Sequence, residues 1–302
     1  MFDENAFQLF VFATNMNAEP HDFRVGHSPD PDDAFMFYAM TSGKIPTHGR
    51  SFEHVLLGID ELNEKARKGI YEVSAISIHS FPEVSDKYTL MNCGGSMGEG
   101  YGPILISRSP MSIEEARGSQ IAIPGKSTSS YLSLCLAVGD VNVVGVPFDQ
   151  ILDRVACGEF RSGVIIHEGQ LTWKKLGFYN ILDLGKWWNE STGLPLPLGG
   201  NIVRNDLGPE LCRGITEDVR NSIEYSLENP ELALEFARKW GRGIDEETNE
   251  EFVRMYVNRR TLDYGNDGRE AIKTFLNMGQ EIGLVRSDFD VDGIRFIGEE
   301  IY

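Results

Sequence analysis

Residues 28–38 read Ser28-Pro29-Asp30-Pro31-Asp32-Asp33-Ala34-Phe35-Met36-Phe37-Tyr38. The two prolines exclude a regular helix or central strand through residues 28–31, because each fixes its own φ and restricts the residue before it. Asp32 then provides an N-cap, and the next aspartate a first-turn acid, for the apolar run over residues 34–40, which predicts a buried helix. The preceding residues 23–27 predict a short strand. A strand, a polar loop and a helix N-terminus in this order are typical of small-anion sites in α/β proteins.

Strand-like and helix-like segments alternate along the first two thirds of the chain. The predicted strands span residues 23–27, 52–57, 72–78, 103–107, 119–123, 141–146, 162–167, 179–184 and 198–204. The predicted helices span residues 33–42, 59–68, 81–87, 111–117, 128–138, 148–157 and 168–176, and four more follow residue 209. This alternation indicates an α/β protein with largely parallel sheets that are covered by helices.

The final third of the chain, residues 209–285, shows only helical patterns, whereas a single doubly wound sheet would go on alternating. Two lobes explain the difference. The chain builds a first lobe from residues 23–107, forms a second lobe over residues 108–202, and returns to complete the first lobe with residues 203–302. Residues 1–22 are predicted to be an N-terminal extension. A ligand would then lie between the lobes, at the carboxyl ends of strands, where closure excludes water.

Composition and charge narrow the choice of partners. The formal net charge is −18, which argues against nucleic acid and anionic membrane surfaces. The apolar run over residues 7–13 is too short to span a bilayer and follows no basic segment, so we expect a cytoplasmic protein. The cysteines form no C-x-x-C pair and no histidine pair has metal-ligand spacing, so no metal site is predicted. Buried free thiols are predicted at Cys93, Cys135, Cys157 and Cys212.

His167 is the candidate general base. It follows the apolar run over residues 163–166, which places it at the carboxyl end of a predicted strand, where α/β proteins form their sites. Imidazole titrates near neutral pH and therefore suits proton abstraction. The residues alone also allow a histidine that is simply hydrogen-bonded at a surface between the lobes. His27 and His79 adjoin other candidate segments and could also line the cleft.

The segment Gly125-Lys126-Ser127-Thr128-Ser129-Ser130 superficially resembles a phosphate loop. The G-x-x-x-x-G-K-[ST] spacing fails, because Gln120 stands where the first glycine is needed, and this argues against an NTPase. What remains is a strand, a tight turn and a hydroxyl-rich helix N-terminus, which suits a carboxylate or sugar hydroxyl. Simple capping of the helix by Ser127 or Thr128 is the alternative.

The amino-acid sequence of several segments resembles that of the menaquinone-biosynthesis enzymes of the futalosine pathway, and among them the 1,4-dihydroxy-6-naphthoate synthases. The opening motif is similar to S-P-C-P-N-D-T-F-x-F-Y of that family, and the colinear matches cover roughly residues 24–285. The most specific string is Trp187-Trp188 followed by T-G-L-P-L-P-L-G over residues 192–199. Further matches lie at Ile76-Ser77, Gly94-Gly95-Ser96, Gly102-Pro103, Pro124 to Thr128, Ile165-Ile166-His167-Glu168, Asp183 to Lys186 and Tyr256-Val257-Asn258.

The resemblance implies a type II periplasmic-binding-protein-like fold, in which each lobe is a mixed, mostly parallel sheet flanked by helices around an interlobe cleft. It implies a carbon–carbon lyase that converts cyclic dehypoxanthine futalosine to 1,4-dihydroxy-6-naphthoate, with no metal or organic cofactor. His167 stands in the I-I-H-E context of the family's catalytic histidine. The expected substrate-binding residues are Ala75, Ile76, Ser77, Thr128, Ser129, Ser28, Asp32 and Ser96.

The chain departs from the family at four places. Ala75 stands where lysine is usual, and Asp30, Asp32 and Ala34 replace cysteine, asparagine and threonine. Losing a cation and gaining carboxylates alters how a small carboxylate substrate would be held. Two other functions stay open: a solute-binding protein without chemistry, against which the absence of an export signal near the start argues, and the sister enzyme chorismate dehydratase. The sequence allows a monomer or a homodimer.

Overall fold

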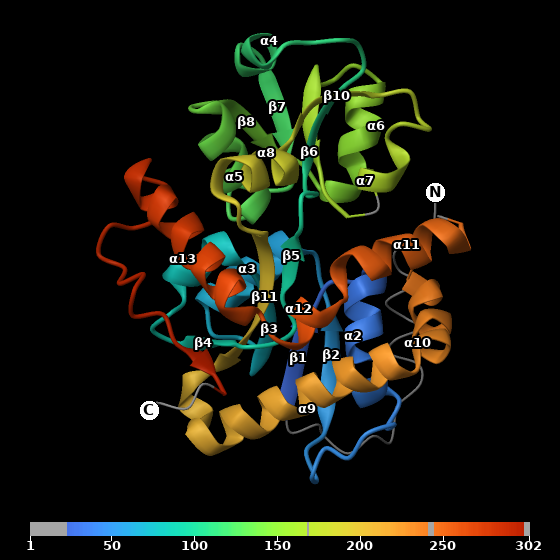
Figure 1. The fold of residues 1–302 in the computed structure, drawn as a ribbon, viewed down its shortest axis with the longest axis vertical. Helices are drawn as coiled ribbons and strands as arrows, with labels where there is room; N and C mark the ends of the chain where they lie inside the picture. The colour runs from blue at the N-terminus through green and yellow to red at the C-terminus, as the bar shows by residue number, and fades with distance from the viewer. Residues whose placement is uncertain (1–22, 168, 241–244, 299–302) are drawn as a thin grey trace.

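The protein is described here by a computed structural model that covers residues 23–167, 169–240 and 245–298, and the predicted extension over residues 1–22 lies outside them. Two lobes lie one above the other, each built on its own β-sheet with helices against it (Figure 1). Within the described residues the larger sheet has seven strands, in the order β12-β4-β11-β3-β1-β2 with β5 paired to β11. The smaller sheet has five, in the order β10-β6-β9-β7-β8. The predicted two-lobed α/β architecture is confirmed.

Every predicted strand is present, with ends that move by a few residues. The larger sheet contains β1 (Phe23–His27), β2 (Phe52–Leu56), β3 (Val73–Ser77), β4 (Tyr88–Met91), β5 (Ser96–Gly98), β11 (Leu196–Arg204) and β12 (Phe296–Ile297). The smaller sheet contains β6 (Ile104–Ser107), β7 (Gln120–Ile123), β8 (Asn142–Gly145), β9 (Ser162–Ile165) and β10 (Tyr179–Asp183). The short strands β4, β5 and β12 were not predicted. The predicted helix over residues 81–87 is instead the 3₁₀ helix η1 (Ile78–Glu83), because Pro82 cannot donate an α-helical hydrogen bond.

Both sheets are mixed but mostly parallel, as the resemblance implied, because a single strand in each runs against the others: β11 in the larger sheet and β6 in the smaller one. In the larger sheet β1–β2, β1–β3 and β12–β4 run parallel, and β11 runs antiparallel to β3, β4 and β5. In the smaller sheet β7 runs parallel to β8 and β9, and β6 runs antiparallel to β9 and β10. The antiparallel pairings belong to β6 and β11, the first strands after the chain crosses between lobes.

The lobe boundaries differ from the predicted ones at residues 107 and 202. β6 belongs to the smaller sheet and β11 to the larger one, so the chain crosses over residues 99–103 and returns over residues 193–195. β6 and β11 were both predicted as strands, but a strand pattern in the sequence does not indicate which sheet the strand joins.

The helices start and end close to the predicted positions. They are α2 (Pro31–Thr41), α3 (Ile59–Arg67), α4 (Ile113–Arg117), α5 (Ser129–Val138), α6 (Ile151–Ala156), α7 (Gly169–Thr172), α8 (Leu184–Thr192), α9 (Pro209–Glu228), α10 (Pro230–Ala237), α11 (Glu246–Tyr256), α12 (Arg259–Leu262) and α13 (Gly265–Glu281). In the described residues five α-helices, rather than four, follow residue 209. α8 was not predicted, although Asp183 caps its start by accepting the Lys186 N–H at 3.0 Å.

Both faces of each sheet are buried. One face of the larger sheet packs against α2, α9 and α10, and the other packs against α13. Trp188 from α8 is fully buried in this second layer, with its ring centroid 5.5 Å from that of Phe275, so it packs where the chain returns between lobes. In the smaller sheet, Ile104 and Ile106 face one core while Leu105 faces the other, as strand alternation requires.

The cysteines are free, and three of the four predictions of buried thiols are confirmed. Cys157 is exposed, because it follows the last turn of α6 as its C-cap and lies beyond the residues that pack on the sheet.

Candidate active site

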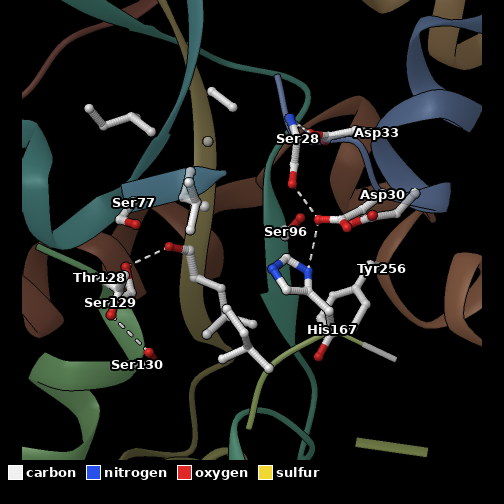
Figure 2. Close-up of a pocket in the computed structure, with 18 of the residues that line it drawn as sticks. Ser28, Asp30, Asp33, Ser77, Ser96, Thr128, Ser129, Ser130, His167 and Tyr256 are labelled. Carbon is white, nitrogen blue, oxygen red and sulfur yellow. Dashed lines mark hydrogen bonds and ion pairs between the residues drawn. The ribbon is translucent and has the colours of Figure 1, made fainter. Parts of the chain in front are cut away.

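A cavity lies between the lobes, where β1, β3 and β9 reach their carboxyl ends (Figure 2). All nine residues predicted for the site line it: His167, Ser28, Asp32, Ala75, Ile76, Ser77, Ser96, Thr128 and Ser129. The lining also includes residues that were not predicted, among them Asp30, Asp33, Ile59, Gly94, Ser130, Gln170, Leu198, Phe252 and Tyr256. No lysine or arginine is among the described residues that line it.

His167 follows β9 in a left-handed backbone conformation, with φ of 56°. Few non-glycine residues adopt this conformation, and such strain gathers at functional sites. Its Nδ1 lies 3.1 Å from Asp30 Oδ2, and its ring centroid lies 4.5 Å from that of Phe148. Its Nε2 is buried and has no hydrogen-bond partner among the described residues. Because Nδ1 faces a carboxylate, the imidazole can present Nε2 as the proton acceptor.

Asp30 connects His167 to the opening motif. Its side chain is only 1% exposed, and its Oδ2 accepts a hydrogen bond from Ser28 Oγ as well as facing His167 (Figure 2). The Ser28 N–H donates to Asp33 Oδ2 at 2.6 Å, which fixes the loop before α2. The pair joins the two lobes, since Asp30 follows β1 and His167 follows β9.

The start of α2 differs from the prediction. Asp30, not Asp32, occupies the N-cap position, and Pro31 is the first helical residue, where its fixed φ and missing N–H are tolerated. Asp32 and Asp33 therefore both lie in the first turn, and both are buried. Burial raises the pKa of Asp32 to about 7, the charge of Asp30 adds to this, and the charge of His167 opposes it. Burial, followed by the charges of Asp32 and Asp30, raises the pKa of Asp33 well above its ordinary range.

Hydroxyl groups form the opposite side of the cavity, from the start of α5 and the end of β3 (Figure 2). Thr128 is the N-cap of α5, and its Oγ1 accepts the Tyr131 N–H at 3.3 Å, so the capping alternative is also correct. Ser129 Oγ donates to Leu198 O of β11 at 2.5 Å, across the gap between lobes. This wall offers hydroxyls and the positive end of a helix dipole.

Asn63 holds this wall in place. It is fully buried in α3, where its Oδ1 accepts the Ser77 N–H at 2.9 Å. Its Nδ2 donates to Ser77 Oγ at 3.1 Å and to Ser127 Oγ at 3.0 Å. One side chain therefore positions a strand end of the larger lobe and the segment before α5 of the smaller lobe.

α11 closes the cavity with Phe252 and Tyr256, neither of which was predicted to belong to the site. The Gln170 amide, oriented so that both its atoms are satisfied, donates to Tyr256 Oη at 2.7 Å and to Gly102 O at 2.8 Å. Its oxygen accepts the His167 N–H at 3.3 Å. Gln170 thereby joins the histidine loop to α11. Tyr256 belonged to a family-like string, but nothing in that string indicated that α11 returns to the cleft.

His27 and His79, for which the sequence left a place in the cleft open, are not among the residues that line the cavity. His27 Nε2 lies 3.1 Å from His54 Nδ1, and burial lowers the pKa of His27 to about 4. His79 contacts the carbonyl oxygens of Thr128 and Leu284, so it joins α5 to the larger lobe. Both side chains are used in packing and hydrogen bonding. Among the described residues, no group of three or more His, Cys, Asp or Glu side chains is arranged to hold a metal ion.

Two curated relatives match most of the chain. A 1,4-dihydroxy-6-naphthoate synthase of Thermus thermophilus is 38% identical over 261 residues, covering 86% of this chain and 95% of that protein. A 1,4-dihydroxy-6-naphthoate synthase of Streptomyces coelicolor is 31% identical over 268 residues, covering 87% and 94%.

Solved structures show the same fold. A protein of Archaeoglobus fulgidus is similar with a TM-score of 0.84 and 43% identity, covering 87% of this chain and 98% of that one. The alkanesulfonate-binding protein SsuA of Xanthomonas axonopodis matches with a TM-score of 0.67 at 11% identity, covering 91% and 98%, which shows that the fold is periplasmic-binding-protein-like. The family model described as menaquinone biosynthesis matches residues 23–281, and this chain therefore belongs to the menaquinone biosynthesis family.

Proposed function

We propose that this protein is a 1,4-dihydroxy-6-naphthoate synthase, a carbon–carbon lyase that acts on cyclic dehypoxanthine futalosine. The observation that carries the proposal is the buried Nε2 of His167, which lines the cavity without a partner among the described residues while Nδ1 faces Asp30. Two relatives that bear this name, each matching more than four fifths of the chain, support it.

In the proposed reaction His167 Nε2 removes the proton of a substrate hydroxyl. The resulting oxyanion forms a carbonyl as the adjacent carbon–carbon bond breaks, and the released electron pair enters the ring that becomes aromatic. Asp30 accepts the Nδ1–H and stabilises the imidazolium that forms. The scheme uses neither a metal nor an organic cofactor. Closure of the lobes positions the substrate and excludes water.

The substrate carboxylate would lie against the hydroxyl wall rather than near the aspartates. Thr128, Ser129 and Ser77 line that side, and the N-terminus of α5 adds backbone donors and a favourable dipole. Neutral donors are needed because no lysine or arginine is among the described lining residues, and Ala75 occupies the place of the family's usual lysine. The ring oxygens and the carbon–carbon bond that breaks would then face His167, with Ser28, Asp32 and Ser96 nearby.

The proposed location is the cytoplasm, and the proposed partner is a small carboxylate substrate. None of the described helices has the length and apolar character needed to cross a bilayer. The acidic net charge of −18 continues to argue against nucleic acid.

Purified protein supplied separately with cyclic dehypoxanthine futalosine and with chorismate tests the proposal. The expected result is naphthoate fluorescence from the first substrate and no loss of the second. Consumption of chorismate would indicate the dehydratase instead. Binding of the futalosine compound with no turnover would indicate a solute-binding protein.

A further inference from the structure

Three carboxyl groups at the start of α2 share a small, poorly hydrated space. Asp30, Asp32 and Asp33 lie within four residues and are 1%, 8% and 8% exposed. Among the described lining residues only His167 can bring a positive charge into the cavity. Three ionised carboxylates would therefore leave an excess of buried negative charge, which is strongly unfavourable.

Hydrogen bonding distinguishes the three groups. Asp30 Oδ2 faces His167 Nδ1 and accepts from Ser28 Oγ, and Asp33 Oδ2 accepts the Ser28 N–H. Asp32 lines the cavity, yet its Oδ1 is buried with no hydrogen-bond partner among the described residues. A buried polar atom without a partner, at the wall of a cavity, points to a group that only a ligand completes.

We propose that Asp32 is held as a neutral carboxylic acid and donates a hydrogen bond to an oxygen of the bound substrate. This inference rests on the proposed function for the identity of the ligand. It makes Asp32 a residue that selects for a hydrogen-bond acceptor at this position, which an ionised aspartate would repel. A protonated carboxyl and an amide are nearly the same size, and both donate and accept.

Burial, together with the charge of Asp30, favours the neutral acid up to about neutral pH. Burial raises the pKa of Asp32 to about 7, with Asp30 acting in the same direction and His167 against it. The other titratable groups that face this cluster do not supply a cation: burial lowers the pKa of His27 on β1 to about 4 and raises the pKa of Tyr256 on α11. Asp33, the neighbour on α2, also has a pKa raised by burial.

Binding of the ligand should weaken as the pH rises. Below about pH 7 the Asp32 proton is present and the donor is available, and above it the donor is replaced by a negative charge. The probe 1,4-dihydroxy-6-naphthoate keeps one ionised carboxylate and neutral phenols from pH 6 to 8.5, so it does not titrate itself. If only the protonated form binds the probe, one proton with a pKa of about 7 weakens binding about 30-fold over this range.

The experiment measures the dissociation constant of the probe by fluorescence titration between pH 6 and 8.5. The affinity of wild type for the probe should fall about 30-fold between pH 6 and 8.5. Asp32→Asn carries a neutral donor at every pH, so its affinity should match that of wild type at pH 6 and should change little with pH. Asp32→Ala should bind weakly throughout. Glu210→Gln is the matched control, because Pro209 and Glu210 begin α9 as Pro31 and Asp32 begin α2, but Glu210 is exposed.

A second measurement needs no ligand. Carbonyl ¹³C NMR of aspartate-labelled protein, with the spectrum of Asp32→Asn subtracted, should show one carboxyl that titrates near pH 7. A midpoint in the ordinary aspartate range would overturn the inference, as would equal pH dependence in wild type and Asp32→Asn. Failure of wild type to bind the probe at pH 6, with the NMR midpoint near 7, would overturn the proposed function instead.

Discussion

Replacing Asn63 with alanine removes a side chain that joins the two walls of the cavity. Asn63 is fully buried and makes hydrogen bonds of 2.9 and 3.1 Å with Ser77 and of 3.0 Å with Ser127 Oγ. Three bonds at a net of about 1 kcal/mol each, with the Ser77 N–H left buried, give a loss of about 3 kcal/mol. The higher helix propensity of alanine offsets this by about 0.6 kcal/mol of unfolding free energy. The expected net loss of unfolding free energy is about 2.5 kcal/mol.

Urea denaturation of wild type and Asn63→Ala measures this loss. Asn189→Ala is the control, since Asn189 is also helical but exposed, and its amide makes one 3.4 Å bond to Leu194 O. That variant should change stability by less than about 0.5 kcal/mol. The Michaelis constant of Asn63→Ala should rise as well, because Ser77 and the segment before α5 lose their common anchor. If Asn63→Ala lost less than about 1 kcal/mol of unfolding free energy, or no more than Asn189→Ala, the result would refute the reasoning.

Three further predictions concern residues that line the cavity. Thr128→Ala and Ser129→Ala should each raise the Michaelis constant more than they lower kcat, at about 0.5–1.5 kcal/mol each, and a fall in kcat at constant Michaelis constant in steady-state kinetics would contradict this. Ala75→Lys should tighten naphthoate binding at low salt, with a smaller gain at high salt, and a salt-insensitive loss of affinity would show that the aspartates have captured the new ammonium. Folding raises the pKa of Asp32 from its ordinary 3.8 to about 7, so native protein binds more protons between these values and loses stability as pH rises through them. Asp32→Asn should therefore raise the melting temperature more at pH 8 than at pH 5, and an equal change at both would contradict the assigned proton.

Local signals predicted much of the scaffold. The Pro-Asp-Pro-Asp-Asp run marked the loop between β1 and α2, and each predicted strand has a counterpart, because turn residues and apolar runs are short-range properties. Placement at strand ends brought His167 and Ser77 to the correct edge of their sheets. The remaining predicted lining residues came from the family-like strings.

Contacts between distant segments were not predictable in the same way. The contact between Asp30 and His167 exists only because the two lobes meet, and no pattern within either segment encodes that meeting. The same holds for Tyr256, whose helix reads as ordinary amphipathic structure. The assignment of β6 and β11 to their sheets depends on pairing across the lobe crossings.

The most direct test of the central claim is the single-turnover rate of naphthoate formation from cyclic dehypoxanthine futalosine by wild type, His167→Gln and His48→Gln. His48 is a matched control, since it is exposed and has a φ of 53°, close to the 56° of His167. A positioned general base contributes on the order of 10²- to 10⁴-fold, so His167→Gln should be at least about 100-fold slower, with naphthoate binding retained and His48→Gln unchanged. A His167→Gln rate within about threefold of wild type would contradict the assignment of His167 as the base.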